Sequence, residues 1–482
     1  MIYHPLYKKY KNKTLMAGVI GPGHYGTAII CQSVGSDMLK IPIAADQNID
    51  RARLAFRKAG IPEEDIITCD SVAQASRAIE TGKYAVVQDA MILMDLPLDV
   101  IVESTGIAAA GAHHALEAIR HGKHVAMVSK ETDSAVGPIL QRLASKSGLT
   151  YTQVDGDHPG LLIGLIYWAR SLGLEIVSAG KSRDVELVLD RRSRIVTCEA
   201  DGITVMQTQT AELSETDLDL FDDLRYGSIP QRVSARRQLL KTMPAAEGYD
   251  HCEVLIAANA CGLAPDIPLL HNPILRTSDI PKVLCPVEQG GILTTSGVVE
   301  VIDCFRDSFE GGLGGAVFVV VSCESDYSRM ILTTKGLVSN QSGNSALIYR
   351  PYHLCGVETS TSILCAGLGN FSTGSDVEEY VQRFDIVRTA HNPLKAGYVF
   401  GGDHDHNIET QILPASSRVP DAPVPAHLLH NRALLVDVPP GALITYSMVA
   451  KPEDSVLWDL RAQQDELFHH AAINEAVVAS KG

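Results

Sequence analysis

The sequence predicts an α/β protein with a doubly wound parallel sheet at the N-terminus, an α+β domain after it and a small β module at the C-terminus. Three observations predict this fold. Strand-like and helix-like segments alternate up to about residue 150, a glycine-rich turn joins the first strand to the first helix, and the pattern changes twice further along. Such alternation is typical of parallel sheets, because each parallel pair of strands needs a crossover connection. At 482 residues, the chain is long enough for two or three hydrophobic cores.

Four apolar runs are predicted to be strands of the first sheet, and three longer segments between them are predicted to be helices. The strands are Leu15–Ile20, Ile41–Ala45, Val100–Glu103 and His124–Val128, and the helices are Tyr25–Val34, Ala108–His121 and Val136–Ser147. The basic N-terminal segment and its short apolar run could be mistaken for a signal peptide. Because the run leads directly into the glycine turn, we interpret it as the first strand.

The turn after this strand carries a dinucleotide-binding fingerprint, Gly21-Pro22-Gly23-His24-Tyr25-Gly26. The first glycine permits a tight turn, the second lets a pyrophosphate approach bare backbone, and the third lets the helix pack close to the strand. Asp46 ends the next apolar run about 20 residues further on, where an acid binds the adenosine ribose. The pattern therefore predicts a Rossmann domain over residues 1–150 that binds NAD or NADP.

Asp46 favours NAD, and the nearby Arg51 and Arg53 leave NADP as the alternative. A small-residue turn, Ser104-Thr105-Gly106, follows another strand, and ligands in such sheets bind beyond the carboxyl ends of strands. The alternative for this turn is a helix cap without a ligand. The predicted cofactor-binding residues are Gly21, Gly23, His24, Tyr25, Gly26, Asp46, Ser104, Thr105, Gly106 and Lys130.

Composition and charge exclude several classes of function. The formal net charge of −16 argues against a nucleic acid or an acidic membrane as partner, because phosphate backbones are bound through basic surfaces. No window approaches the roughly 20 apolar residues that span a bilayer. The ten cysteines show no CxxC spacing, so we expect reduced thiols and a cytoplasmic location.

Residues 151–395 are predicted to form the domain that binds substrate and mediates oligomerisation, with strands such as Ile292–Val301 and Ala316–Ser322. Within it, Asp184–Gln238 is dense in charges of both signs. We interpret this segment as a solvated surface loop, with a mobile lid as the alternative, because charge runs are usually solvated.

Residues 396–482 begin with proline-rich spacing and continue with a strand–turn–strand pattern, Ala433–Val438 and Leu443–Tyr446, and a final helix. The segment Gly401–His406 contains two histidines in a glycine turn. We favour a structural turn there over a metal site, which needs three or four convergent ligands.

Three further patterns point to chemistry. Lys130 follows the strand His124–Val128, so it is expected at the cofactor crevice, where a cation can orient a substrate oxygen; a surface lysine is the alternative. Asp155 and Asp157 lie two residues apart, a spacing that in an extended segment places both carboxylates on one side to hold Mg²⁺ or Mn²⁺. The alternative is an Asp/Gly turn with a helix-capping aspartate. Arg350 and His353 could bind a phosphate or a carboxylate.

Several of these segments resemble known families. The segment Gly122–Glu131 resembles the one in homoserine dehydrogenases and deoxyxylulose phosphate reductoisomerases in which a strand ends in a lysine beside the nicotinamide. Asp155-Gly156-Asp157-His158 resembles the D-x-E-H metal motif of the reductoisomerases, with Asp157 in place of glutamate. Ala179-Gly180-Lys181 is similar to the position of a catalytic lysine in homoserine dehydrogenases. The segments Arg350–Glu358 and Leu434–Val449 extend the resemblance to nearly the whole chain. The chain as a whole resembles homoserine-dehydrogenase-like oxidoreductases with a C-terminal SAF domain, a group that includes the type II reductoisomerase-like (DRL) proteins.

The resemblance implies three domains with separate functions. Residues 1–150 would bind NAD(P), residues 151–395 would carry catalysis and oligomerisation, and residues 396–482 would form a SAF-like module. It implies a homo-oligomer, a dimer or a tetramer, that acts on a small molecule. The implied catalytic residues are Lys130, Lys181 and Asp155, the metal ligands are Asp155 and Asp157, and the substrate contacts are Glu131, His158, Asn259, Arg350 and His353.

Three functions compete. In the first, 1-deoxy-D-xylulose 5-phosphate is converted to 2-C-methyl-D-erythritol 4-phosphate, an isoprenoid precursor, with Mg²⁺ or Mn²⁺ bound to Asp155 and Asp157. In the second, a small hydroxylated metabolite is oxidised without a metal, and Lys130 and Lys181 carry the acid–base chemistry. In the third, the chain is a non-catalytic nucleotide sensor.

Overall fold

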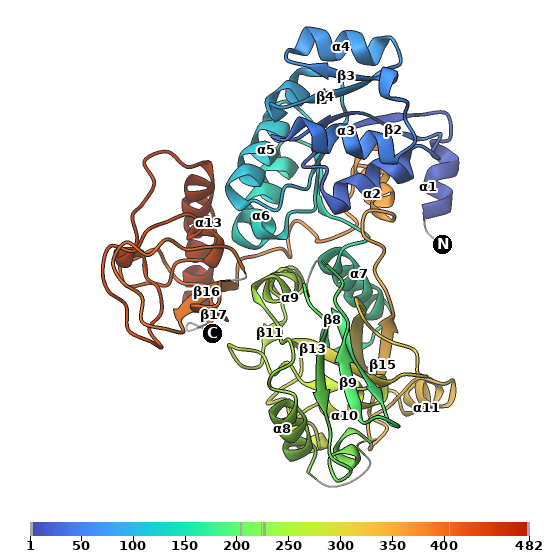
Figure 1. The fold of residues 1–482 in the computed structure, drawn as a ribbon, viewed down its shortest axis with the longest axis vertical. Helices are drawn as coiled ribbons and strands as arrows, with labels where there is room; N and C mark the ends of the chain where they lie inside the picture. The colour runs from blue at the N-terminus through green and yellow to red at the C-terminus, as the bar shows by residue number, and fades with distance from the viewer. Residues whose placement is uncertain (1–2, 203–204, 223, 225–227, 404, 480–482) are drawn as a thin grey trace. The chain divides into compact units, whose positions relative to one another are not determined.

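The computed structural model describes residues 3–202, 205–222, 224, 228–403 and 405–479, and its chain forms two compact units (Figure 1). The first unit contains residues 1–160, 354–409 and 414–482, and the second contains residues 161–353 and 410–413. The predicted boundaries near residues 150 and 395 do not coincide with these limits. Residues 354–395 and most of the C-terminal segment belong to the same compact unit as the N-terminal domain.

The first unit contains a seven-stranded sheet in the order β3-β4-β2-β1-β5-β6-β7, in which every neighbouring pair is parallel. This order, with β1 in the middle, confirms the predicted doubly wound sheet. Its strands are β1 Leu15–Ile20, β2 Leu39–Ala45, β3 Ile66–Cys69, β4 Tyr84–Val87, β5 Val100–Glu103, β6 His124–Met127 and β7 Tyr151–Gln153.

The helix α1, Tyr3–Lys9, precedes the sheet. Between its strands lie α2 His24–Ser33, α3 Ile49–Lys58, α4 Val72–Glu80, α5 Ala108–Arg120 and α6 Lys130–Lys146, of which α2, α5 and α6 were predicted. The start of α6 was placed too late, because the helix begins at Lys130 and not at Val136. Glu131 and Asp133 occupy its first turn, where acidic side chains interact favourably with the helix dipole.

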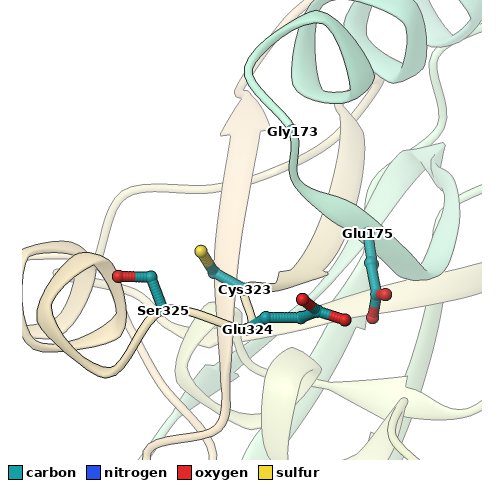
Figure 2. Close-up of a pocket in the computed structure, with 5 residues that line it drawn as sticks. All are labelled: Gly173, Glu175, Cys323, Glu324 and Ser325. Carbon is teal, nitrogen blue, oxygen red and sulfur yellow. The ribbon is translucent and has the colours of Figure 1, made fainter.

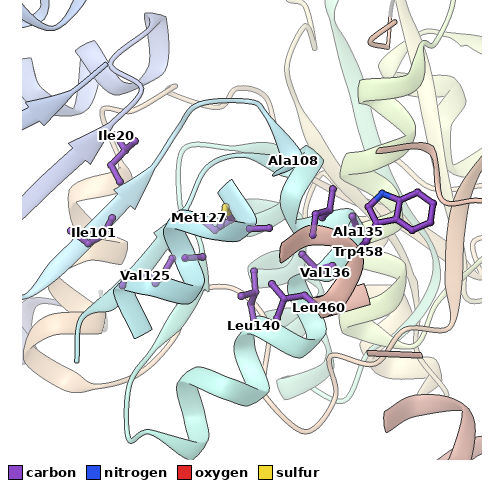
Figure 3. Packing of buried hydrophobic residues seen from close by; sticks show 14 of the residues in the cluster. Ile20, Ile101, Ala108, Val125, Met127, Ala135, Val136, Leu140, Trp458 and Leu460 are labelled. Atoms are coloured by element: carbon purple, nitrogen blue, oxygen red, sulfur yellow. The ribbon is translucent and has the colours of Figure 1, made fainter. Parts of the chain in front are cut away.

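The C-terminal helix α13, Val456–Ala479, packs against α5 and α6 in one apolar core with the parallel sheet. Figure 3 shows Trp458 and Leu460 among Ala135, Val136 and Leu140 of α6. Burying an apolar side chain of this size stabilises a fold by about 1.5 to 3 kcal/mol. The final helix was predicted correctly, and its shared core explains why the C-terminal segment belongs to the first unit.

Before α13, the chain forms a small β structure with two strands, β16 Phe384–Ala390 and β17 Ile408–Pro414. The predicted strands 433–438 and 443–446 are wrong. These segments form isolated bridges, including those of Ala433 with Val399 and of Val438 with Leu394. The segments around them are rich in proline, which has no backbone N–H to continue a ladder.

The second unit is built on a mixed eight-stranded sheet. Its strands are β8 Glu175–Asp190, β9 Ile195–Cys198, β10 Gln209–Glu212, β11 Ala264–Pro265, β12 Ile274–Leu275, β13 Val298–Asp307, β14 Val317–Ser322 and β15 Ser345–Arg350. Its helices include α8 Ile229–Leu239, α9 Gly248–Cys261, α10 Ile280–Val283 and α11 Asp326–Thr334. The helix α7, His158–Ser171, begins in the first unit, to which α12, Thr359–Leu364, also belongs.

The predicted strand at 316–322 is confirmed, whereas the one predicted at 292–301 begins later, as β13. The surface-loop interpretation of Asp184–Gln238 is wrong for most of that segment, which contains part of β8, then β9, β10 and α8. Its charges are partly buried because they are paired: Arg236 is fully buried and lies 2.7 Å from Asp279.

Two other predictions concern the whole chain. Among the described residues, no helix has the length and the apolar character that crossing a bilayer requires. All ten cysteines are free thiols, as expected. The cytoplasmic location stays a prediction.

Candidate active site

The glycine turn between β1 and α2 has the geometry that the fingerprint predicts. Gly21 has φ of +78°, and a Cβ there would lie 2.7 Å from the Thr105 Cα. A Cβ on Gly26 would lie 2.8 Å from the Ser104 Oγ, whereas a Cβ on Gly23 would meet no atom within 4 Å. Gly21 and Gly26 are therefore required by packing, and Gly23 leaves open space in front of the turn.

This open space faces the beginning of α2. The helix has Gly23 as its N-cap and no side-chain cap, and the exposed His24 is its first residue. Its first-turn N–H groups therefore have no partner inside the helix, an arrangement suited to a phosphate. Ser104 Oγ donates to the carbonyls of Ile20 and Gly21 at 2.9 Å each and so fixes the turn after β5 against the glycine turn. The cradle fits the pyrophosphate of NAD or NADP.

Tyr25 contacts protein rather than open space. Its hydroxyl lies 2.9 Å from the Thr359 Oγ1 and 3.5 Å from the Asp155 carbonyl, and burial raises its pKa well above the usual range. The Tyr25 side chain therefore joins the beginning of α2 to Thr359 and to the backbone of Asp155. Its predicted contact with the cofactor stays a prediction.

Asp46 follows β2, as the fingerprint requires. Its Oδ1 accepts from the Asn48 N–H at 2.8 Å, and its Oδ2 lies 3.6 Å from the Arg51 guanidinium, which is 58% exposed. The Arg53 guanidinium donates to the Glu63 carboxylate, and it donates to the Thr68 Oγ1 at 2.9 Å. Of the two arginines, Arg51 is therefore the one available to a 2′-phosphate.

The turn Ser104-Thr105-Gly106 is fixed from both sides. Thr105 Oγ1 donates to the buried Glu103 carboxylate at 2.6 Å, and the Gly106 N–H donates to the Ser129 Oγ at 2.8 Å.

Lys130 does not end a strand as predicted, because β6 stops at Met127 and Lys130 is the first residue of α6.

Glu131 follows Lys130 and faces the same turn. A Cβ built on Gly106 would lie 3.9 Å from both of its carboxylate oxygens. Burial raises the pKa of Glu131 to about 7, opposed by the nearby Lys130 and His427. The carboxyl group therefore titrates near neutral pH at the carboxyl end of the sheet.

Asp155 and Asp157 lie in a turn after β7, so the extended segment that was predicted there is wrong. Tyr3 donates to Asp155 at 3.4 Å, and Asp157 Oδ1 accepts from the N–H of His158, the buried first residue of α7, at 3.0 Å. The charge of Asp155 acts on Tyr3, and that of Asp157 acts on Tyr25. The two carboxylates thus have different neighbours.

In the second unit, Lys181 of β8 lies among carboxylates of α9. Its ammonium is fully buried, 2.9 Å from Asp250 and in contact with Glu253. Although burial alone would raise the pKa of Asp250, Lys181 and Arg183 hold it below its usual value. These contacts stabilise the protonated ammonium of Lys181.

Arg183 extends this cluster to β13. Its guanidinium lies 3.2 Å from Asp250 and 3.3 Å from Asp303 and donates to the Tyr249 hydroxyl at 3.3 Å. Sequence reasoning missed Arg183, Asp250, Glu253 and Asp303. One signal was present, because Asp250 and Glu253 lie three residues apart, a spacing that places them on one face of a helix.

The register of the second sheet relates Lys181 to Arg350. Lys181 pairs with Val317 of β14, and Val317 pairs with Arg350 of β15, both in antiparallel ladders. Directly opposed residues of antiparallel strands point to the same face. Lys181 and Arg350 therefore share one face of the sheet.

The other predicted substrate residues of this unit are more scattered. The Arg350 guanidinium lies 5.1 Å from the centre of the Tyr352 ring. His353 Nδ1 lies 2.9 Å from the Gly315 carbonyl, and its Nε2 lies 3.6 Å from Asp184. Asn259 is buried in α9.

A surface pocket of the second unit contains none of the predicted residues. It has a volume of about 540 Å³ and is lined by Gly173, Glu175, Cys323, Glu324 and Ser325. Figure 2 shows the two carboxylates and the thiol around it.

Two segments of the chain match known protein families. Residues 33–152 match the NAD binding domain of homoserine dehydrogenase, and residues 247–359 match the catalytic domain of oxidoreductase DRL. A 1-deoxy-D-xylulose 5-phosphate reductoisomerase of Rhodopirellula baltica is 32% identical over 92 residues, which are 19% of this chain and 20% of that protein. One of Jannaschia sp. is 29% identical over 119 residues, 24% of this chain and 29% of that protein. The chain thus spans less than a third of the length of either relative.

Solved structures are similar over about a third of the chain. A DOX-P reductoisomerase in complex with magnesium has a TM-score of 0.27 and 17% identity, covering 36% of this chain and 46% of that one. Myo-inositol dehydrogenase from Lactobacillus casei has a TM-score of 0.26 and 16% identity, covering 35% and 46%. The two matches support an NAD(P)-dependent oxidoreductase whose residues 33–152 are similar to the NAD binding domain of homoserine dehydrogenase and whose residues 247–359 are similar to the DRL catalytic domain.

Proposed function

We propose that this oxidoreductase catalyses a reductoisomerisation, the conversion of 1-deoxy-D-xylulose 5-phosphate to 2-C-methyl-D-erythritol 4-phosphate. One observation carries the proposal: the segment that matches the DRL catalytic domain supplies both the carboxylates that hold Lys181 and the arginine on the same sheet face, Arg350. A buried ammonium and a guanidinium on one face of the sheet suit a substrate with a carbonyl and a phosphate. The names of the two curated relatives support the same substrate.

The first unit would hold the cofactor at Gly23, Asp46 and the turn Ser104–Gly106, and the bound dinucleotide supplies the hydride. The chain's own residues handle the proton and the charge. Because Asp250 and Glu253 keep Lys181 protonated, it donates a proton to the developing alkoxide rather than abstracting one. Arg350 anchors the phosphate through paired N–H donors.

The proposed metal site fits less well. Carboxylate oxygens suit Mg²⁺ or Mn²⁺, but Asp155 and Asp157 lie in a turn beside different groups, and one oxygen of Asp157 accepts from the N–H of His158. We therefore derive no step through a metal.

A second candidate is a dehydrogenase acting on a small hydroxylated metabolite. It is favoured by the match of residues 33–152 to homoserine dehydrogenase and by the acid–base cluster around Lys181, which requires no metal. A homo-oligomer is proposed for both candidates.

A turnover screen separates these functions. NADPH and NADH oxidation would be followed with 1-deoxy-D-xylulose 5-phosphate, other ketose phosphates and hydroxy-aldehydes, with Mn²⁺ and after exhaustive chelation. The reductoisomerase predicts turnover of the deoxyxylulose phosphate, and the chelated sample shows whether that turnover needs a metal. Turnover of another substrate that survives chelation identifies the dehydrogenase, and intact cofactor binding without any turnover identifies a sensor.

Replacing Lys181 tests the acid. Lys181→Met should lower the turnover rate by roughly 10² to 10⁴, the contribution of a positioned general acid. Lys335→Met, on the exposed end of α11 in the same unit, is the control and should leave the rate unchanged. A folded Lys181→Met protein with full activity would show that the proton comes from another group.

A further inference from the structure

A chain of buried polar groups joins the beginning of α6 to the C-terminal module within the first unit. Ser134 Oγ lies 3.1 Å from His427 Nδ1, in the short helix Ala426–Leu428, and His427 Nε2 lies 3.4 Å from Asp403 Oδ2. The other oxygen of Asp403 contacts the Arg388 guanidinium of β16. The side chains of His427 and Asp403 are each 10% exposed.

The charges along this chain are ordered. Burial would raise the pKa of Asp403, but His427 and Arg388 hold it well below the usual value, so the carboxylate is ionised. His427 Nε2 faces Asp403 and its Nδ1 faces Ser134, so the imidazole ring joins these two side chains. Since buried ion pairs contribute little net stability, this arrangement calls for another explanation.

Glu131 lies at the other end of this arrangement. Ser134 Oγ lies 3.4 Å from the Glu131 carbonyl, one helical turn away. The charges of Lys130, on the same helix, and of His427 favour the ionised Glu131 carboxylate, and that of Asp403 disfavours it. Arg388 acts on this group through Asp403, with which it is paired.

The strand order places Glu131 on the nicotinamide side of the crevice. The sheet runs β2-β1-β5-β6, and Asp46 after β2 marks the adenosine side of the glycine turn. A dinucleotide that lies across the crevice therefore has its nicotinamide over the ends of β5 and β6. Glu131 faces Gly106 at the end of β5.

We propose that Glu131 discriminates between the two redox forms of the cofactor by exchanging a proton, and that His427 and Asp403 of the C-terminal module are the positioning residues that tune this exchange. The oxidised nicotinamide ring carries a positive charge and favours the ionised carboxylate, whereas the neutral reduced ring favours the protonated carboxyl. Binding of the oxidised form therefore releases a proton from Glu131 to solvent, and binding of the reduced form does not. The inference rests on the proposed NAD(P) site.

Calorimetric titration of the full-length protein tests this without turnover. NAD⁺, NADP⁺ and their reduced forms would be titrated at several pH values in two buffers of different ionisation enthalpy, which yields the number of protons exchanged. Up to about 0.5 protons should be released per oxidised cofactor near pH 7, because a group with a pKa of about 7 is then half ionised. The release should fall toward zero well below and well above that pH.

Variants identify the groups. Glu131→Gln should bind the cofactor and release no proton. His427→Asn removes a charge that favours the ionised form, so the maximum of proton release should move to higher pH. His430→Asn, at an exposed position three residues further on, is the matched control and should behave as the wild type does.

Two results would overturn the inference and are distinguishable. Cofactor binding with unchanged proton release in Glu131→Gln shows that another group titrates, and the NAD(P) site then stands. The absence of any binding to the wild type removes both the site and the inference. An unshifted maximum in His427→Asn refutes the role of the C-terminal module.

Discussion

In the first unit, the glycine turn between β1 and α2 presents backbone to a ligand, whereas in the second unit Lys181 and Arg183 are surrounded by carboxylates of α9 and β13. The turn comes from six consecutive residues, and a Cβ on its central Gly23 would meet no protein atom within 4 Å. The charged cluster joins residues that lie more than a hundred positions apart, and its members are almost fully buried.

This difference predicts how a substitution in each region affects stability and cofactor binding. A side chain on Gly23 enters space that only a ligand needs, so the fold should survive and binding should fail. Removal of one charge from the cluster leaves buried groups of opposite charge with fewer partners, so the fold itself should weaken. Three substitutions test this contrast.

The largest effect is expected from Arg183→Leu in the cluster. Asp250 and Asp303 would remain buried without this partner, which should lower the free energy of unfolding by about 3 to 5 kcal/mol. Arg51→Leu is the control, because its exposed pair with Asp46 in the first unit contributes about 0 to 1 kcal/mol. Urea denaturation measures both. Equal losses in the two variants would break the comparison.

Gly23→Asp should abolish cofactor binding while the protein stays folded. A carboxylate about 4 Å from a phosphate is disfavoured by about 1 to 4 kcal/mol, depending on the effective dielectric, which corresponds to roughly 5- to 10³-fold in affinity. Nicotinamide fluorescence titration gives the affinity. Gly35→Asp, at an exposed position past α2, should bind normally. Unchanged affinity in Gly23→Asp would mean that the pyrophosphate binds elsewhere.

The smallest effect should come from Asp46→Ser, which sharpens the description of the crevice. Loss of the carboxylate relieves repulsion of a 2′-phosphate and leaves Arg51 available to it, so the ratio of affinities should shift toward NADP. At about 1 kcal/mol for charges 4 Å apart in water, the shift is roughly fivefold. Asp50→Ser, in the first turn of α3, is the control. If both cofactors weaken equally, Asp46 does not contact the ribose region.

Local patterns predicted β1, β2, β5 and β6 of the first sheet, because these strands are short, apolar and bounded by turn residues, whereas β3 and β4 were not predicted. The same reasoning placed the start of α6 at Val136, since the polar residues at its beginning lack an apolar period. It also assigned Asp184–Gln238 to solvent, because nothing in that segment shows that Arg236 meets Asp279.

The sequence by itself determined the parallel sheet, the glycine turn and the acid after β2, because these depend on backbone geometry and on residues close together in the chain. Only the tertiary structure decided that Lys181 lies between Asp250 and Glu253, that Arg350 shares its sheet face, and that His427 reaches the start of α6. Those contacts join distant segments, and a charged or polar residue looks the same in a sequence whether it is solvated or paired. The pairing depends on strand register and helix packing, which are set by the core as a whole.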